Sequence, residues 1–125
     1  MMGVFLVGVG GGAGAIARLL FGRAYLRLFG PNQPYMSTFF INILGGLAMG
    51  LLVGVLARTG ASERLRLLLA VGVLGGFTTY SAYALDAALL IERKAYGAAF
   101  LYMIGSATLT VVAVFLGLML VRKWA

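Results

Sequence analysis

The sequence predicts an all-α membrane protein with four transmembrane helices, and both its composition and its length indicate this class. Of the 125 residues, 62% are hydrophobic and 10% are charged, whereas a soluble domain is roughly 45–50% apolar and about a quarter charged. One transmembrane helix takes about 20 residues, so the chain has room for four passes and little else. We therefore expect residues 1–125 to form a single four-helix transmembrane domain.

The first two spans are separated by a clear helix breaker. The first is expected over about residues 3–28, and since no basic segment precedes its apolar run, it is expected to be a retained helix and not a signal peptide. Residues 30–34 read Gly-Pro-Asn-Gln-Pro and end it. The second span is expected over about residues 36–57. The polar turn after it contains Ser62, which can cap the next helix.

The third span, over about residues 65–91, is predicted to be broken at its centre. Residues 75–81 read Gly-Gly-Phe-Thr-Thr-Tyr-Ser, and glycines followed by β-branched threonines are poor helix material. A continuous helix here would be about 40 Å long, more than a ~30 Å hydrocarbon core requires. Irregular backbone at this depth survives only when it is buried or lines a cavity, and its freed carbonyls can hold a cation. The alternative is an unbroken helix whose hydroxyls bond to its own carbonyls.

A fourth span is expected over about residues 96–120, and with four passes the basic residues divide equally between the two sides. One side would hold Arg58, Arg64, Arg66, Arg122 and Lys123, and the other Arg18, Arg23, Arg27, Arg93 and Lys94. Orientation is set by the difference in Lys and Arg between the sides, and here there is none. The sequence therefore predicts dual topology and an antiparallel homodimer.

Composition excludes most enzyme classes and does not favour a nucleic-acid partner. The chain has no cysteine and no histidine, which removes thiol nucleophiles, zinc sites and the usual proton shuttle. Its three acids, Glu63, Asp86 and Glu92, are too few and too dispersed for paired-carboxylate chemistry or a hard-metal cage. The net charge of +7 comes from basic residues at helix ends, where they contact lipid headgroups. Such positive mouths would also favour a permeant anion.

Several polar groups lie where lipid would not tolerate them without a reason. Asn42 lies on the face of the second span that also carries glycines at every fourth position, and it either joins helices or faces a polar pathway. Arg18 lies deep in the first span, where an unpaired guanidinium costs several kcal/mol. An aqueous vestibule would resolve that cost. In the fourth span three hydroxyls share one face, over about 12 Å of rise, and either bond to their own backbone or form a row of donors: Tyr102, Ser106 and Thr110.

Together these residues resemble the Fluc family of fluoride channels, the CrcB-like proteins. The matching segments are residues 11–18 (GGAGAIAR), 38–45 (TFFINILG) and 75–83 (GGFTTYSAY). The resemblance implies a passive fluoride-selective channel of the cell (inner or plasma) membrane that exports cytoplasmic fluoride and so lowers its toxicity. It also implies an antiparallel homodimer with two pores, and a structural sodium ion at its centre held by backbone carbonyls at the positions of Gly75 and Thr78.

The resemblance further implies which residues line the fluoride pathway. Asn42 matches a pore asparagine, Arg18 a vestibule arginine, and the row Tyr102, Ser106 and Thr110 a polar track. The helix-three motif adds Thr79, Tyr80, Ser81 and Tyr83. The family's usual motif has two phenylalanines whose ring edges face the anion, and this chain has Tyr80 and Tyr83 there, with Ala82 in place of a threonine. Each tyrosine keeps the positive ring edge and adds a hydroxyl donor.

Two other functions are compatible with a small four-helix membrane chain. A proton-coupled multidrug exporter needs a carboxylate embedded in the membrane, but the first span has no acid and Asp86 lies towards the end of the third. An assembly subunit that binds larger membrane partners would use the glycine faces, but it would leave Arg18 and the hydroxyl row without a role.

Overall fold

The computed structural model describes residues 1–124, and all of their regular secondary structure is helical. The helices are α1 (Met2–Phe29), α2 (Tyr35–Thr59), α3 (Glu63–Arg66), η1 (Leu67–Leu74), α4 (Gly75–Phe77), α5 (Ser81–Glu92) and α6 (Tyr96–Trp124). Four helical stretches are long and apolar enough to cross a membrane, the third being Glu63–Glu92 with its internal break. The four predicted spans are confirmed, each to within a few residues.

The residues expected to separate the spans do end or cap helices in the structure. Gly30 follows α1 with a positive φ of 84° and begins the loop to Pro34, while Gly60 ends α2 in the left-handed conformation, at a φ of 62°. The Ser62 side chain accepts a hydrogen bond from the Leu65 amide at 3.3 Å, so Ser62 is the predicted N-cap.

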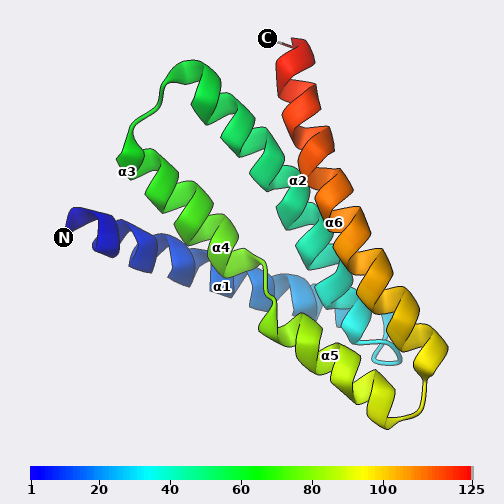
Figure 1. Ribbon diagram of the computed structural model, residues 1–125. Helices are drawn as coiled ribbons and strands as arrows, with labels where there is room; N and C mark the ends of the chain where they lie inside the picture. The colour runs from blue at the N-terminus through cyan, green and yellow to red at the C-terminus, as the bar shows by residue number, and fades with distance from the viewer. Residues whose placement is uncertain (125) are drawn as a thin grey trace.

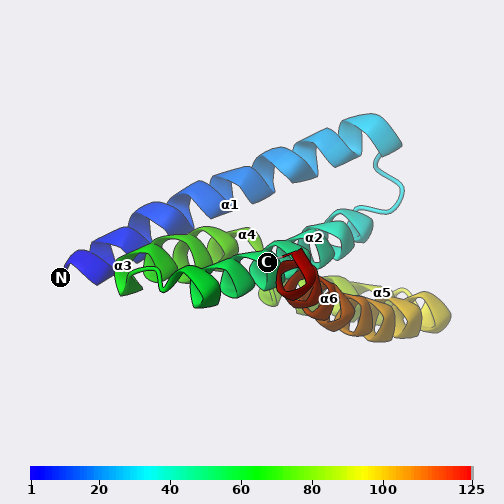
Figure 2. The same ribbon diagram turned by 90° about the horizontal axis from the view of Figure 1, so that it is seen from above.

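The third span changes neighbours at its break. Its first half, η1 and α4, packs along α1, whereas α5 packs on α6, and α2 lies along most of α6 (Figure 1). Seen from above, α1 lies on one flank of the molecule with η1 and α4 beside it, and α5 and α6 lie on the opposite flank (Figure 2). The break is therefore where the chain passes from one helix pair to the other.

Glycines set the close approach within both pairs. A Cβ on Gly10 or Gly14 would overlap backbone atoms of η1, and a Cβ on Gly50 would overlap the Val114 carbonyl oxygen of α6. The expected glycine faces are therefore helix contacts, as in other membrane bundles, where small residues allow backbones to meet. Large apolar side chains such as Phe5, Ile16 and Phe115 are at least 60% exposed, which suits a surface in contact with lipid.

The segment Leu67–Leu74 is a π-helix, which the sequence analysis did not predict. In a π-helix the backbone bonds run from i to i+5, and such segments are rare and short. Here the wider turn brings Gly72 against Gly10, where a Cβ on Gly72 would lie 3.0 Å from the Gly10 Cα. Nothing in the local sequence indicates a π-helix, because Leu-Leu-Leu-Ala-Val-Gly-Val-Leu is also a good α-helical segment.

Candidate functional site

The third span is broken at Thr78-Thr79-Tyr80, within the predicted region. Thr78 adopts an extended conformation (φ −80°, ψ 159°), and both its amide and its hydroxyl still donate to the Leu74 carbonyl at 3.0 Å. The next amide, that of Thr79, leaves the helical pattern and donates to Asn42 Oδ1 at 2.9 Å. The helix therefore ends at Phe77 and begins again at Ser81.

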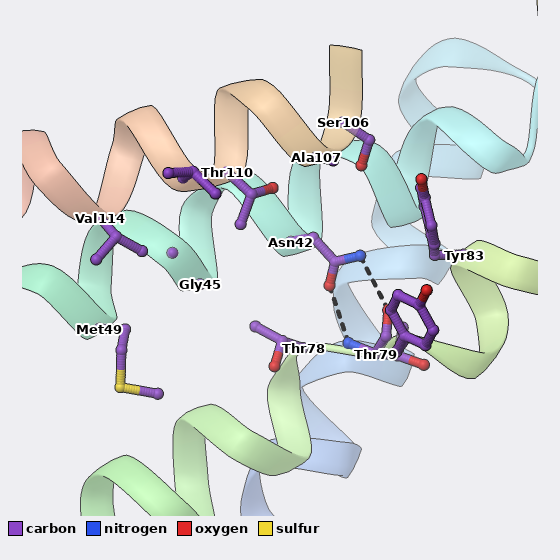
Figure 3. A pocket seen from close by; sticks show the side chains of 13 residues that line it. Asn42, Gly45, Met49, Thr78, Thr79, Tyr83, Ser106, Ala107, Thr110 and Val114 are labelled. Atoms are coloured by element: carbon purple, nitrogen blue, oxygen red, sulfur yellow. Dashed lines mark hydrogen bonds between the residues drawn. The ribbon is translucent and has the colours of Figure 1, made fainter. Parts of the chain in front are cut away.

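Asn42 holds the peptide at this break from both sides. Its Oδ1 accepts from the Thr79 amide, and its Nδ2 donates to the Thr79 carbonyl at 3.0 Å (Figure 3). Asn42 is only 9% exposed, and a buried amide without partners would cost about 1–3 kcal/mol. One side chain thus satisfies the two backbone groups that the break would otherwise leave unpaired, and keeps one Nδ2 hydrogen for another acceptor.

The break also frees carbonyl groups on its N-terminal side. In a continuous helix the Thr79 amide would donate to the Gly75 carbonyl and the Ala82 amide to the Thr78 carbonyl. Instead the Thr79 amide binds Asn42, and the Ala82 amide donates to Thr79 Oγ1 at 3.2 Å. The Thr78 carbonyl accepts a hydrogen bond from Arg18 Nη1 at 3.4 Å, so Arg18 has a neutral backbone partner and not an acid.

A cavity of about 480 Å³ lies beside the break, between α2, α5 and α6. Seven of the candidate residues from the sequence lie on its wall. They are Asn42, Thr78, Thr79, Tyr80, Tyr83, Ser106 and Thr110. Figure 3 shows Asn42 from α2, Ser106 and Thr110 from α6, and Thr79 from the break around this space. Hydroxyl and amide groups gather here among apolar residues, and no acidic residue lines the cavity.

The expected hydroxyl row of α6 divides between two environments. Ser106 and Thr110 line the cavity, and the Thr110 hydroxyl is buried without a hydrogen-bond partner among residues 1–124. Tyr102, one turn earlier, lies in an apolar cluster with Ala87, Leu90 and Ala99, and its hydroxyl donates to Asp86 Oδ2 at 3.2 Å. The three residues share a face as predicted, but only two of them border the cavity.

The two tyrosines of the motif also differ. Tyr83 is half-buried and its hydroxyl donates to the Met103 carbonyl of α6 at 2.9 Å. The Tyr80 side chain is 81% exposed in the single copy and has no hydrogen-bond partner within residues 1–124. Their ring centroids are 5.5 Å apart. Ser81 is exposed, lies 3.4 Å from Thr79 by their hydroxyl oxygens, and is not part of the cavity wall.

A second cavity of about 400 Å³ lies on the other side of the break, between α1 and α2. Arg18 and Arg23 line it with the hydroxyl residues Ser37 and Thr38. Thr79 is the one residue that lines both cavities, so the peptide held by Asn42 separates them. The positive lining agrees with the vestibule expected around Arg18.

Some features of this site were not predicted from the sequence. The double hydrogen bond from Asn42 to Thr79, the pairing of Tyr102 with Asp86, and the presence of Arg23, Ser37 and Thr38 in the second cavity are seen only in the structure. Asp86 could have indicated such a pairing, because it is the one acid within a predicted span and a carboxylate in the membrane needs a donor.

Comparison with known proteins identifies the family. The family model described as CrcB-like protein, Camphor Resistance (CrcB), matches residues 5–118. The chain belongs to the CrcB-like family. A relative from Phenylobacterium zucineum is 58% identical over 98% of this chain and 98% of its own length, and one from a Caulobacter species is 50% identical over 98% and 97%. A third, from Caulobacter vibrioides, is 47% identical over 96% and 95%.

All three of these CrcB-like relatives carry the name fluoride-specific ion channel FluC. The resemblance found in three short segments of the sequence is confirmed over almost the whole chain. Together with the four apolar helices, this identifies a multi-pass membrane protein and not an enzyme.

Proposed function

We propose that this chain is a passive ion channel that selects fluoride and lets it leave the cytoplasm. One observation carries the proposal. In a chain of the CrcB-like family, a cavity between α2, α5 and α6 is lined by amide and hydroxyl donors and by no acid of the described residues, next to the break of the third span. That the anion is fluoride is inferred from the relatives named fluoride-specific ion channels.

The chemistry of the lining suits a small, strongly hydrated anion. Fluoride leaves water only where donors replace its hydration shell, and carboxylates would repel it. The pathway we assign runs from Arg18 past the break to α6. Its donors are Arg18, Asn42, Thr79, Tyr80, Ser81, Ser106 and Thr110, and the rings of Tyr83 and Tyr102 pack against each other beside it. Arg18 attracts the anion, and the free Nδ2 hydrogen of Asn42 and the Thr110 hydroxyl are donors without a protein partner in the described chain.

No energy source beyond the membrane potential is needed for export. Fluoride enters cells as uncharged HF, which dissociates inside, and an inside-negative potential favours exit of an anion by about 2.3 kcal/mol per 100 mV. A passive channel in the cell (inner or plasma) membrane therefore suffices to lower fluoride toxicity.

We further propose that two copies of the chain assemble antiparallel in the membrane, with two pores. The equal division of Lys and Arg between the two sides supports dual topology. The 81% exposure of Tyr80 supports a partner, because a motif tyrosine on the wall of a donor-lined cavity would otherwise face lipid.

A structural sodium ion at the dimer centre is part of this proposal. The carbonyls of Gly75 and Thr78 would hold it, since the Thr79 and Ala82 amides that normally close on them are bound elsewhere. The Thr78 oxygen accepts from Arg18 Nη1 at 3.4 Å and has a second lone pair for the ion. Carbonyl oxygens freed at a helix break are suitable Na⁺ ligands, and a second copy would double their number. When bound, the ion supplies positive charge at the subunit interface.

A proton-coupled exporter is not favoured. Such a transporter needs a carboxylate in its substrate cavity, whereas neither cavity is lined by an acid, and Asp86 accepts a hydrogen bond from Tyr102 outside them.

Purified protein in liposomes tests the function directly. With potassium shunted by an ionophore, fluoride should leave the liposomes and chloride should not. Equal release of both anions would contradict selectivity, and no release of either would contradict channel function.

A further inference from the structure

Two tyrosine side chains form hydrogen bonds between α5 and α6, and each helix contributes one of them. Tyr83 of α5 donates to the Met103 carbonyl of α6 at 2.9 Å, and Tyr102 of α6 donates to Asp86 Oδ2 of α5 at 3.2 Å. Their rings lie beside each other, with centroids 5.5 Å apart and planes inclined by 34°. Each helix therefore donates one hydroxyl and accepts one, and we name Tyr83 and Tyr102 the crossed tyrosine pair.

The crossed pair connects the break to the cavity wall. α5 begins just after the break, at Ser81, and α6 carries Ser106 and Thr110 one and two turns beyond Tyr102. Apart from this pair, the contact between α5 and α6 is formed by small and aliphatic residues such as Ala87, Leu90 and Ala99. The two hydrogen bonds add directional contacts to this packing, and so constrain how α5 can slide or rotate against α6.

The hydroxyl of Tyr83 is therefore already in use. To donate to an anion in the cavity it would have to leave the Met103 carbonyl, in a medium without water to replace that bond. Tyr102 is in the same situation, because releasing it would leave the Asp86 carboxylate unpaired within the membrane. Neither hydroxyl is a free donor for the pathway.

Tyr80 differs from Tyr83 and Tyr102 in the state of its hydroxyl group. It lines the same cavity and stacks near Tyr83, but its hydroxyl has no hydrogen-bond partner in the described part of the chain. Of the three tyrosines at the pathway, it alone keeps its proton available.

From this difference we propose that the three tyrosines have separate roles. Tyr83 and Tyr102 are positioning residues that fix α5 against α6 through their hydroxyls, and Tyr80 is the tyrosine whose hydroxyl donates to the anion. This rests on the proposed function, because the anion is fluoride only if the chain is a fluoride channel. The hydroxyls of Tyr80 and Tyr83, which phenylalanine would lack, therefore have different roles within one short motif.

The test compares three matched variants, Tyr80→Phe, Tyr83→Phe and Tyr102→Phe, each of which removes one hydroxyl and keeps the ring. Fluoride efflux from liposomes gives the fluoride concentration for half-maximal rate, and amide hydrogen exchange without fluoride reports on α5 and on the first half of α6. Tyr80→Phe should raise the half-maximal concentration at least tenfold, the ratio expected when one hydrogen bond to a charged group is lost, and leave exchange unchanged. Tyr83→Phe and Tyr102→Phe should change that concentration less than twofold and speed exchange in α5 and α6 about fivefold.

Two substitutions at Asp86 distinguish loss of the hydrogen bond to Tyr102 from a general loss of stability. Asp86→Asn keeps an oxygen acceptor for Tyr102 and should keep slow exchange, whereas Asp86→Ala should exchange as fast as Tyr102→Phe. The proposal is overturned if Tyr83→Phe raises the half-maximal fluoride concentration as much as Tyr80→Phe, or if exchange is unchanged in Tyr83→Phe. Wild-type liposomes that release no fluoride would overturn the proposed function and the role of Tyr80. The exchange rates would still decide on the crossed pair.

Discussion

Asn42 uses both ends of its side-chain amide to bind the backbone N–H and C=O of a single residue, Thr79, and this arrangement has no close substitute. A hydroxyl could supply only one of the two bonds at this spacing, and a carboxylate could accept from the amide but would repel the carbonyl. The residue therefore carries two duties at once. It stabilises the break, and it presents the remaining Nδ2 hydrogen beside the cavity.

Replacing Asn42 should affect stability and conduction together. Asn42→Ala leaves the Thr79 amide and carbonyl without partners, at a cost of about 1–3 kcal/mol, so the thermal midpoint in detergent should fall and flux should be lost. Asn42→Asp keeps the acceptor but adds a negative charge to the pathway, and fluoride efflux should fall at least tenfold. Asn32→Asp, in the exposed loop after α1, is the matched control and should conduct normally. Normal flux through Asn42→Asp would contradict the role given to the amide.

Thr110 offers the opposite case, because its hydroxyl is buried without a partner. Thr110→Val keeps the shape and removes a hydroxyl that contributes no hydrogen bond to the fold, so the thermal midpoint should stay the same or rise. Fluoride efflux should nevertheless fall about tenfold, since hydrogen bonds to charged groups contribute about 1.5–3 kcal/mol.

The control for Thr110 is Thr108→Val, which changes an exposed hydroxyl outside the cavity. It should alter neither stability nor efflux. A Thr110→Val channel that conducts like the wild type would show that this hydroxyl does not contact the anion.

At the scale of the helices, the two pairs are held together by backbone contact where glycine leaves room. A Cβ at Gly50 would overlap the Val114 carbonyl oxygen and lie 3.0 Å from the Gly117 Cα, both in α6. Such contact gives dispersion energy in a medium where no hydrophobic effect drives helices together.

Gly50→Ala should therefore force α2 away from α6 and destabilise the protein by about 1–3 kcal/mol, seen as a lower thermal midpoint. Gly97→Ala provides the comparison, because a Cβ there meets no atom within 4 Å. Removing a helical glycine without a clash should leave the midpoint equal or raise it. Equal midpoints for the two variants would mean that α2 and α6 do not need this close contact.

Spans, loops, the Ser62 cap and the break were predictable, because each follows from residues close in sequence. The π-helix was not, because residues 67–74 are equally suited to an α-helix and only the structure shows Gly72 beside Gly10 of another helix. In the site, too, the residues could be predicted from the sequence but their contacts with other helices could not. The motif identified Asn42 and Thr79 as candidates, but the two hydrogen bonds between them depend on how α2 meets the break. Tyr102 shows the limit of spacing arguments, because a shared helix face did not reveal that Asp86 holds its hydroxyl.

For the whole molecule, the absence of cysteine allows orientation to be measured with one added thiol. Asn32→Cys and Ala61→Cys place it in loops at opposite ends of α2. An impermeant thiol reagent should label about half of the copies of each variant in intact cells, because dual topology exposes each loop in half of the chains. Full labelling of one variant and none of the other would establish a single orientation.

Orientation should also respond to added charge. Asn32→Lys with Gln33→Lys gives one side two more positive charges, and the side with more Lys and Arg stays in the cytoplasm. A third substitution, Ala61→Cys, again provides the thiol, and its labelling should move well away from half. The doubly substituted chain should lose fluoride efflux when produced alone and recover it with a copy biased the other way.

The exchange of neighbours at the break has a mechanical consequence. α1 with η1 and α4 forms one rod, and α2 with α6 and α5 forms another, and between η1–α4 and α5 the chain is non-helical only over three residues. Rocking one rod against the other would widen or narrow the passage by rotation about those few dihedral angles, without opening a turn of any helix. Asn42 of α2 binds the backbone of Thr79 at this pivot, so its two hydrogen bonds would resist that rotation.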